Sequence, residues 1–207
     1  MAYSIGCGIF PDEPSANSQE AVFLPDNGDF DNVRLIDYTQ DEGGLIPQRG
    51  GLTVGRPYAP GPMPTKIKRD GRDAKRLSVL DVEHFYGQPL VIEAFKDIVE
   101  EHEPDVHQFF PMDAYIGEEL VGKYFYFNVC NRLSTIHREK TFPLNERGFW
   151  KPKKGEPSAF VLSTELIGSH HAWRDKFGHG CYISDKLGGR LIKEGFSGIN
   201  FLTVEEA

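Results

Sequence analysis

The chain of 207 residues is long enough to bury about two-thirds of the surface that its unfolded form exposes, which allows one independent core. Its hydrophobic content of 39% and charged content of 26% exclude wholesale disorder and a fibrous architecture. The formal net charge of −8 disfavours direct binding to nucleic acid, whose phosphates repel an acidic surface.

The start of the chain has no basic region followed by an apolar stretch, and no run of apolar residues is long enough to span a membrane. Cys7, Cys130 and Cys181 are an odd number of cysteines that lie far apart in the sequence. This pattern suits reduced thiols better than a disulfide framework. We therefore expect a cytoplasmic protein without a membrane partner.

The charge is distributed unevenly along the chain. Six basic residues and two aspartates between Lys66 and Arg76 give that stretch a formal charge of +4, which leaves −12 on the rest. The stretch lacks the interleaved aromatic residues of a nucleic-acid-binding segment, and we interpret it as a solvated loop.

Residues 41–76 are rich in glycine and proline, which disfavour regular secondary structure. We expect a long irregular connection here, which is either a contact surface or a mobile linker. The sequence accordingly predicts two regions: an irregular, β-rich N-terminal region over residues 1–77 and an α+β domain over residues 78–207.

The first elements of the second region have clear periodicities. Val91, Phe95, Ile98 and His102 recur at helical spacing, which predicts a helix that begins near Pro89 and ends before Pro104. A short strand is expected over Val106–Met112, with its proline, Pro111, at a strand end or edge.

The strongest strand pattern runs from Lys123 to Asn131. Phe125, Phe127 and Val129 alternate along it, and we expect them to form its core face.

The C-terminal part predicts a strand at Ala159–Ser163, a helix capped by Ser184 and ended by Gly195, and a strand over Ile199–Leu202. The two helix–strand pairs have similar spacing, which favours one sheet with helices on one face. The expected fold class is α+β: a small mixed or antiparallel sheet with a few helices packed on it, and a long irregular Gly/Pro-rich segment in the N-terminal half.

Three motifs carry a family resemblance. They are His107-Gln108-Phe109-Phe110-Pro111, the aromatic run Tyr124–Val129 and the helix–glycine–strand unit from Ser184 to Leu202. In this order and spacing they resemble the myxobacterial-type immunity family of bacterial polymorphic toxin systems, over roughly residues 78–207. The Gly/Pro-rich and basic segment before Leu77 departs from the family pattern.

The resemblance implies a cytosolic, non-catalytic antidote that binds and neutralises a toxin encoded beside it, often a nuclease-type toxin. It supplies no catalytic residues to carry over, and we expect neither a metal nor a cofactor. An acidic protein surface can occupy the basic cleft that a nuclease presents to its substrate, and opposite charges speed the association. We therefore expect the partner-binding residues to be Glu100, Glu101, Glu103, Asp105, Tyr115, Glu118, Glu119 and Trp173. Trp150 is a further candidate anchor, and at least one of the three aromatic anchors is expected in the core.

Two alternatives remain open. A metal-dependent hydrolase could use His170, His171, His179 and Cys181, although their spacing matches no standard zinc site. The chain has no catalytic signature motif, which disfavours an enzyme. A generic protein-binding adaptor could instead use the Gly/Pro-rich segment.

Overall fold

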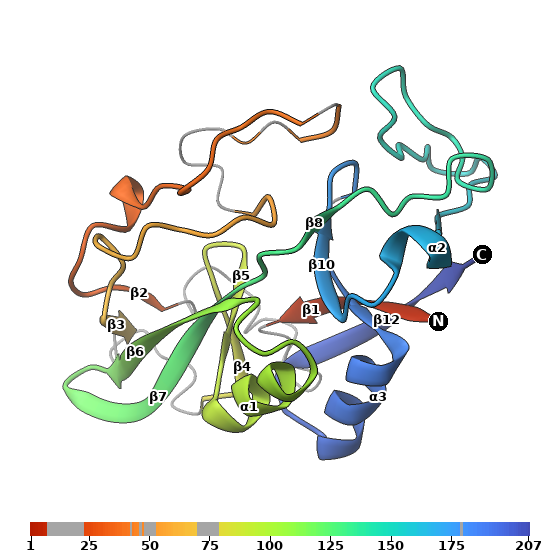
Figure 1. Ribbon diagram of the computed structural model, residues 1–207. Coiled ribbons are helices and arrows are strands. Elements are labelled where there is room, and N and C mark those ends of the chain that lie inside the picture. Colours follow the sequence, from red (N-terminus) through yellow and green to blue (C-terminus); the bar gives the residue numbers. More distant parts are fainter. Residues whose placement is uncertain (8–22, 42, 46, 48–52, 70–78, 179) are drawn as a thin grey trace.

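The computed structural model describes residues 1–7, 23–41, 43–45, 47, 53–69, 79–178 and 180–207. Within these residues the chain forms two six-stranded mixed sheets, which curl like half-barrels, and three α-helices (Figure 1). None of the described helices is long and apolar enough to cross a membrane.

The first sheet combines the N-terminal strand with strands from the C-terminal half. Its order is β8 (Arg132–Leu133), β10 (Ala172–Asp175), β11 (Cys181–Ser184), β1 (Ala2–Cys7), β12 (Ile199–Glu206) and β9 (Val161–Leu162). β1 is antiparallel to both of its neighbours, and Ala2 pairs with both Ser184 and Val204. The first residues of the chain therefore form the centre of a sheet.

The second sheet contains the strands from the middle of the chain. Its order is β2 (Leu24–Pro25), β3 (Lys66–Arg69), β6 (Gln108–Ile116), β7 (Glu119–Asn128), β5 (Gln88–Val91) and β4 (Val82–Phe85). The hairpin of β6 and β7 is its longest paired region, and a turn at Gly117 and Glu118 joins the two strands.

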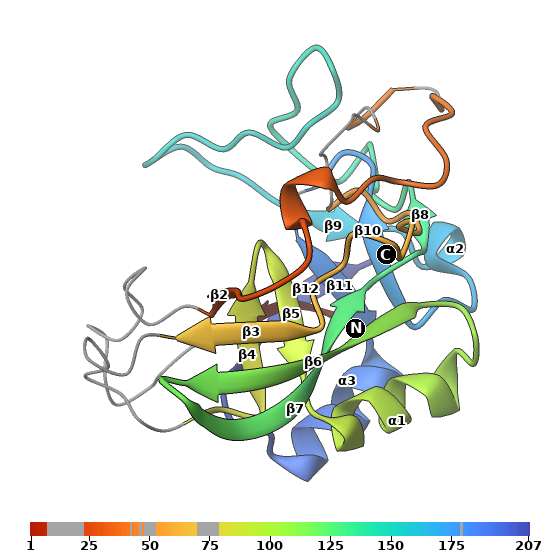
Figure 2. The same ribbon diagram turned by 90° about the vertical axis from the view of Figure 1, so that its left-hand side faces the viewer.

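The helices are α1 (Glu93–His102), α2 (Thr164–Ile167) and α3 (Asp185–Glu194), with a 3₁₀ turn at Phe30–Asn32. α1 and α3 lie side by side beneath the two sheets (Figures 1 and 2). Their packing brings together the two helix–strand pairs that the sequence analysis singled out.

The two pairs are parts of the same local topology. In the first strand–helix–strand unit, β5 and β6 flank β7, and both are antiparallel to it. In the second unit, β11 and β12 flank β1 in the same way. α1 connects the outer strands of the first unit, and α3 connects those of the second. The similar spacing along the sequence thus corresponds to a shared topology, but the units lie in two sheets, and the expectation of a single sheet was wrong.

Local sequence accounts for the ends of α3. The Ser184 side chain accepts a hydrogen bond from the Leu187 N–H at 3.3 Å, and Gly195 ends the helix in the left-handed conformation at φ 72°. Both features match the prediction. A Cβ atom on Gly188 would lie 2.4 Å from Tyr3 Cδ2, so this glycine permits α3 to pack closely on β1.

The helix predicted from Pro89 begins later. Pro89 and Val91 belong to β5, and α1 starts at Glu93 and ends before Pro104. Pro111 lies within β6 but on the part of its edge that β3 does not reach, because β3 pairs only with Asp113–Ile116. A proline is tolerated there because no ladder hydrogen bond is needed from its nitrogen.

The core fills both faces of β7, and the prediction of one core face was incomplete. Phe127 and Val129 are buried on the side of α1 and α3, while Tyr124 and Tyr126 are buried on the other side. The first sheet and the helices cover one face of the second sheet. Described residues between Phe23 and Met63, such as Phe30 and Tyr58, supply side chains to the other.

The described part of residues 41–76 is mostly irregular, as expected, but Lys66–Arg69 forms strand β3. The interpretation of this basic stretch as a loop was therefore wrong for those four residues, and Arg69 is buried at 2% exposure. The remainder of the basic stretch, residues 70–76, lies outside the described residues.

Asp41 anchors the irregular segment to the rest of the fold. Its carboxylate pairs with Arg56 at 3.1 Å, with Arg132 at 2.9 Å and with Lys176 at 3.2 Å. Burial raises the pKa of Asp41, but hydrogen bonds from Arg132 and Lys176 outweigh it and lower the pKa to about 2. These contacts fasten the segment to β8 and to the end of β10.

The fold class is thus mixed α and β, mostly strand, with two large sheets in place of the small single sheet expected. A division of the chain at residue 77 stays a prediction. Strands that precede and follow this position share each sheet, with β1 in the first sheet and β2 and β3 in the second.

Candidate functional site

The acidic residues around the end of α1 are divided between the surface and the interior. Glu101 and Asp105 are exposed and Glu100 is half-buried, whereas Glu103 is only 7% exposed. A partner can reach three members of this group. We call them the acidic helix end: Glu100, Glu101 and Asp105.

Glu103 points inward and joins the two sheets. One carboxylate oxygen accepts hydrogen bonds from the Ala172 N–H at 2.8 Å and from His107 Nε2 at 2.9 Å, and the other accepts one from Asn131 Nδ2 at 2.9 Å. Burial raises the pKa of Glu103, but the hydrogen bond from His107 and those from the backbone of His171 and Ala172 lower it to about 2. Glu103 therefore stabilises the fold as a buried carboxylate.

His107 is held in one tautomer by this network. Its Nδ1 accepts a hydrogen bond from the Cys130 N–H at 3.2 Å, so its Nε2 carries the proton that is donated to Glu103.

The second acidic pair lies at the opposite end of β6. Glu118 and Glu119 are exposed at the turn between β6 and β7. Glu118 pairs with Lys68 at 2.5 Å, and the Lys66 ammonium lies 4.4 Å from the centre of the Tyr115 ring. The nine residues of β6 separate this turn from the end of α1 by roughly 25–30 Å. The structure therefore places the predicted acidic residues on two separate surfaces, and lysines partly neutralise the second.

The candidate aromatic anchors have different surroundings. Trp173 is 0% exposed, and its indole N–H donates a hydrogen bond to Thr135 Oγ1 at 3.1 Å. It is therefore a core residue. Tyr115 is half-buried beside Lys66, and Trp150 is half-buried in a loop that passes over the first sheet.

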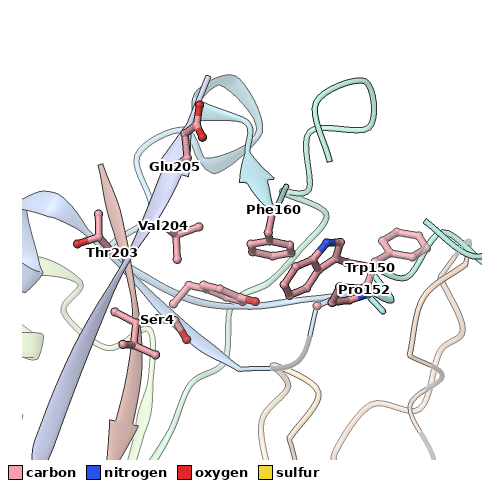
Figure 3. A pocket seen from close by; sticks show the side chains of 11 residues that line it. Ser4, Trp150, Pro152, Phe160, Thr203, Val204 and Glu205 are labelled. Carbon is pink, nitrogen blue, oxygen red and sulfur yellow. The ribbon is translucent and has the colours of Figure 1, made fainter. Parts of the chain in front are cut away.

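Trp150 forms one wall of a pocket of about 650 Å³ on the first sheet (Figure 3). Its ring packs against Phe160 at 5.0 Å between centroids, and Phe160 stacks on Tyr182 at 6.0 Å. Ser4, Leu202 and Val204 contribute from β1 and β12. A pocket of this size with mainly aromatic and aliphatic walls can hold one or more apolar side chains of a binding partner.

The histidines and cysteine proposed as metal ligands are not brought together within the described residues. His171 Nδ1 lies 2.7 Å from Ser184 Oγ, and His170 lies 3.5 Å from Glu103. Cys181 is buried in the core cluster that includes Leu187. His179 lies outside the described residues, and the rest of the described chain contains no group of three or more side chains able to hold a metal.

Sequence reasoning identified Trp150 but missed the rest of the pocket. Phe160 lies just before β9 and Tyr182 lies in β11, and the arrangement of these strands in the first sheet brings the two rings together. A usable signal was the uncharged run from Ile199 to Val204, of which Ile199–Leu202 was predicted only to be a strand.

These features define a β-rich protein with two curled mixed sheets, exposed acidic residues at the end of α1 and an aromatic pocket on the first sheet. The model of the Immunity protein family (Imm11) matches residues 25–206, and the chain belongs to this family. The match includes all three motifs on which the resemblance was based and extends through the N-terminal irregular segment. A comparison with curated proteins found no match.

Proposed function

We propose that this protein neutralises a cognate bacterial toxin by binding it in the cytoplasm, without catalysis. The observation that carries the proposal is membership of the immunity protein family, whose model spans residues 25–206. Membership of this family implies a toxin as partner, and binding alone is sufficient to block a toxin whose active surface is covered.

The charge of the molecule supports a basic partner. With a net charge of −8, the protein attracts a cationic surface over a distance of about one Debye length, roughly 8–10 Å at physiological salt. A nuclease toxin presents such a surface to its substrate. We therefore propose a nuclease as the toxin and the acidic helix end as one of the regions that face it.

The first test is survival of cells that express the toxin domain encoded beside this gene, with and without this protein. Rescue together with a stable purified complex is the expected result. Rescue without a complex would contradict neutralisation by binding and would favour enzymatic protection. Absence of rescue would reject the proposal.

Charge reversal tests where the complex forms. The triple variant Glu100→Lys, Glu101→Lys and Asp105→Lys should slow association with the toxin and weaken its dependence on salt, because charges at the rim of an interface act mainly on the association rate. Glu103 is left unchanged because it is buried.

The matched control is Glu139→Lys, Glu146→Lys and Glu165→Lys, which changes the net charge equally at exposed positions elsewhere. Equal effects of the two triple variants on the association rate would show that only net charge matters. The acidic helix end would then not face the toxin.

A further inference from the structure

Within the described part of the chain, strand β12 has a strand neighbour on only one side for most of its length. β1 pairs with it from Ile199 to Val204, whereas β9 pairs only with Glu205 and Glu206. On the side away from β1, no strand and no backbone hydrogen bond of the described residues reaches the stretch from Ile199 to Val204. This side of residues 199–204 is called here the outer edge of β12.

The outer edge lacks the features with which proteins usually prevent strand edges from pairing. Such edges commonly carry a proline, a charged residue or a bulge. The sequence Ile-Asn-Phe-Leu-Thr-Val contains no proline and no charge, and its pairing with β1 is regular throughout. Leu202 is 59% exposed in the middle of this stretch.

The aromatic pocket lies directly beside this edge. β9 pairs with only two residues of β12. The chain that precedes β9 turns away from β12, and Ala159 pairs with Phe142 instead. The resulting gap is bounded by β12 on one side and by Phe160 and Trp150 on the other. In Figure 3, Val204 points from β12 toward Phe160, while Thr203 points to the opposite side of the strand.

We propose that an extended segment of the toxin pairs with the outer edge of β12 and places an apolar side chain in the aromatic pocket. This inference rests on the proposed function and specifies its interface. Backbone N–H and C=O groups of alternate residues in β12 provide the hydrogen bonds, and the pocket selects the side chain that faces it. The added segment lies on the same side of β12 as β9, next to the residues of β12 that β9 does not reach.

Charge favours the toxin over a second copy of this protein as the occupant. Two copies, each with a net charge of −8, repel each other, whereas a cationic toxin is attracted. Glu205, which directly follows the outer edge and pairs with β9, is exposed and forms no ion pair with the described residues. We infer that the toxin segment carries a basic residue next to the apolar one, because neighbouring strand residues face opposite sides.

Hydrogen exchange of the complex with the toxin domain encoded beside the gene tests the pairing directly. Backbone amides of residues 199–204 that point outward should exchange more slowly in the complex than in the free protein. Unchanged exchange at these amides in a stable complex would overturn the inference, because strand pairing must protect them.

Variants test the side-chain contact. Leu202→Lys and Trp150→Ala should each weaken toxin binding by about tenfold or more, as expected for residues at the centre of an interface. Ile192→Lys, on the exposed face of α3, is the matched control, since Ile192 is 45% exposed and lies outside the pocket. Equal affinities of Leu202→Lys and Ile192→Lys for the toxin would reject the proposed contact.

The outcomes separate this inference from the proposed function. If the unmodified protein does not bind the toxin, both proposals fail. If it binds and neutralises the toxin but residues 199–204 show neither protection nor sensitivity to substitution, only the edge-pairing inference fails. If sedimentation shows a dimer of this protein that Leu202→Lys dissociates, with toxin binding unaffected, the edge pairs with a second copy and the inference is wrong.

Discussion

The two strand–helix–strand units share a topology but differ in how their outer strands are protected. Among the described residues, part of β6 in the first unit has a strand neighbour on one side only, as does part of β12 in the second. The free part of β6 contains Pro111, and the segment around Tyr58 covers it: the Tyr58 ring stacks on Phe110, and its N–H donates to Gln108 Oε1 at 2.7 Å. The free part of β12 has no such cover among the described residues. Equivalent positions in two similar units thus differ: the segment around Tyr58 covers the edge of β6, whereas none of the described residues pairs with the corresponding edge of β12.

The connections that follow the two helices also differ. After α1, Glu103 reaches the first sheet through the N–H of Ala172. After α3, Ser197 reaches the second sheet, where its C=O accepts from the Val82 N–H at 3.0 Å and its N–H donates to Asp81 Oδ2 at 2.8 Å. Each unit therefore forms hydrogen bonds to the sheet of the other. The first of these connections is a buried carboxylate, and the second is exposed. Substitutions in equivalent places should consequently have unequal effects.

The largest effect on stability is expected for Phe127→Ala in β7, the central strand of the first unit. Phe127 is 0% exposed, and its ring stacks on Phe109 at 4.9 Å between centroids and packs against Phe95 at 6.1 Å. Truncation should lower the free energy of unfolding by about 3–5 kcal/mol, measured by urea denaturation. Phe201→Ala in β12 should cost less than half as much, because Phe201 is only half-buried. Equal losses would show that the outer strand of the second unit is as tightly packed as the centre of the first.

The next largest effect is expected for Glu103→Gln, which should cost about 1.5–3 kcal/mol because hydrogen bonds to a charged group are lost from a buried site. The pKa of Glu103 is lowered from its ordinary 4.5 to about 2. Its carboxylate therefore stabilises the fold fully above pH 4.5, and this contribution is lost as the pH falls toward 2. Between pH 4.5 and 2, the free energy of unfolding should therefore fall less steeply for Glu103→Gln than for the unmodified protein.

Asp81→Asn is the matched control, because it changes the second connection between the sheets, the hydrogen bond from Ser197 to Asp81. Its partner Ser197 is exposed, so the substitution should cost less than Glu103→Gln at neutral pH. If Asp81→Asn lowered the free energy of unfolding more than Glu103→Gln, the exposed hydrogen bonds of Ser197 would be the stronger connection between the sheets.

Adjacent glycines in α3 should respond in opposite directions to alanine. Gly188→Ala places a Cβ atom 2.4 Å from Tyr3 Cδ2, so β1 or α3 must shift, at a cost of about 1–3 kcal/mol. Gly189→Ala meets nothing within 4 Å and should stabilise the helix by about 0.5–1 kcal/mol. Thermal unfolding of the two variants measures both signs. Stabilisation by Gly188→Ala would show that α3 does not pack closely on β1.

Local patterns predicted the elements whose causes are local. The stripe of Phe95 and Ile98 indicated α1, and Ser184 and Gly195 marked the ends of α3 correctly. The partition into two sheets could not be predicted, because it depends on the pairing of Ala2 with Val204, residues at opposite ends of the chain. No periodicity within a window of ten or twenty residues carries that information.

In the candidate site, too, features with local causes could be predicted, and features that depend on contacts between distant residues could not. The acidic residues were visible as a cluster in the sequence, but the alternation of exposed and buried positions around the end of α1 turns Glu103 inward and leaves Glu101 and Asp105 outside. The pocket depends on contacts between segments that are distant in the sequence, such as Phe160 with Tyr182. Strand propensity indicated β12, but only the register of its neighbours shows that no strand of the described residues pairs with its outer edge.

The smallest effect on stability is expected where the effect on binding is proposed to be large. Leu202 is 59% exposed, and a lysine there can extend into solvent, so Leu202→Lys should change the free energy of unfolding by no more than about 0.5 kcal/mol. Urea denaturation of the isolated variant measures this change. A loss of several kcal/mol would mean that Leu202 supports the first sheet, and weaker toxin binding by this variant would then follow from damage to the fold. A stable variant that binds the toxin poorly would instead separate the two roles of β12: pairing with β1 maintains the sheet, and the opposite edge is available to a partner.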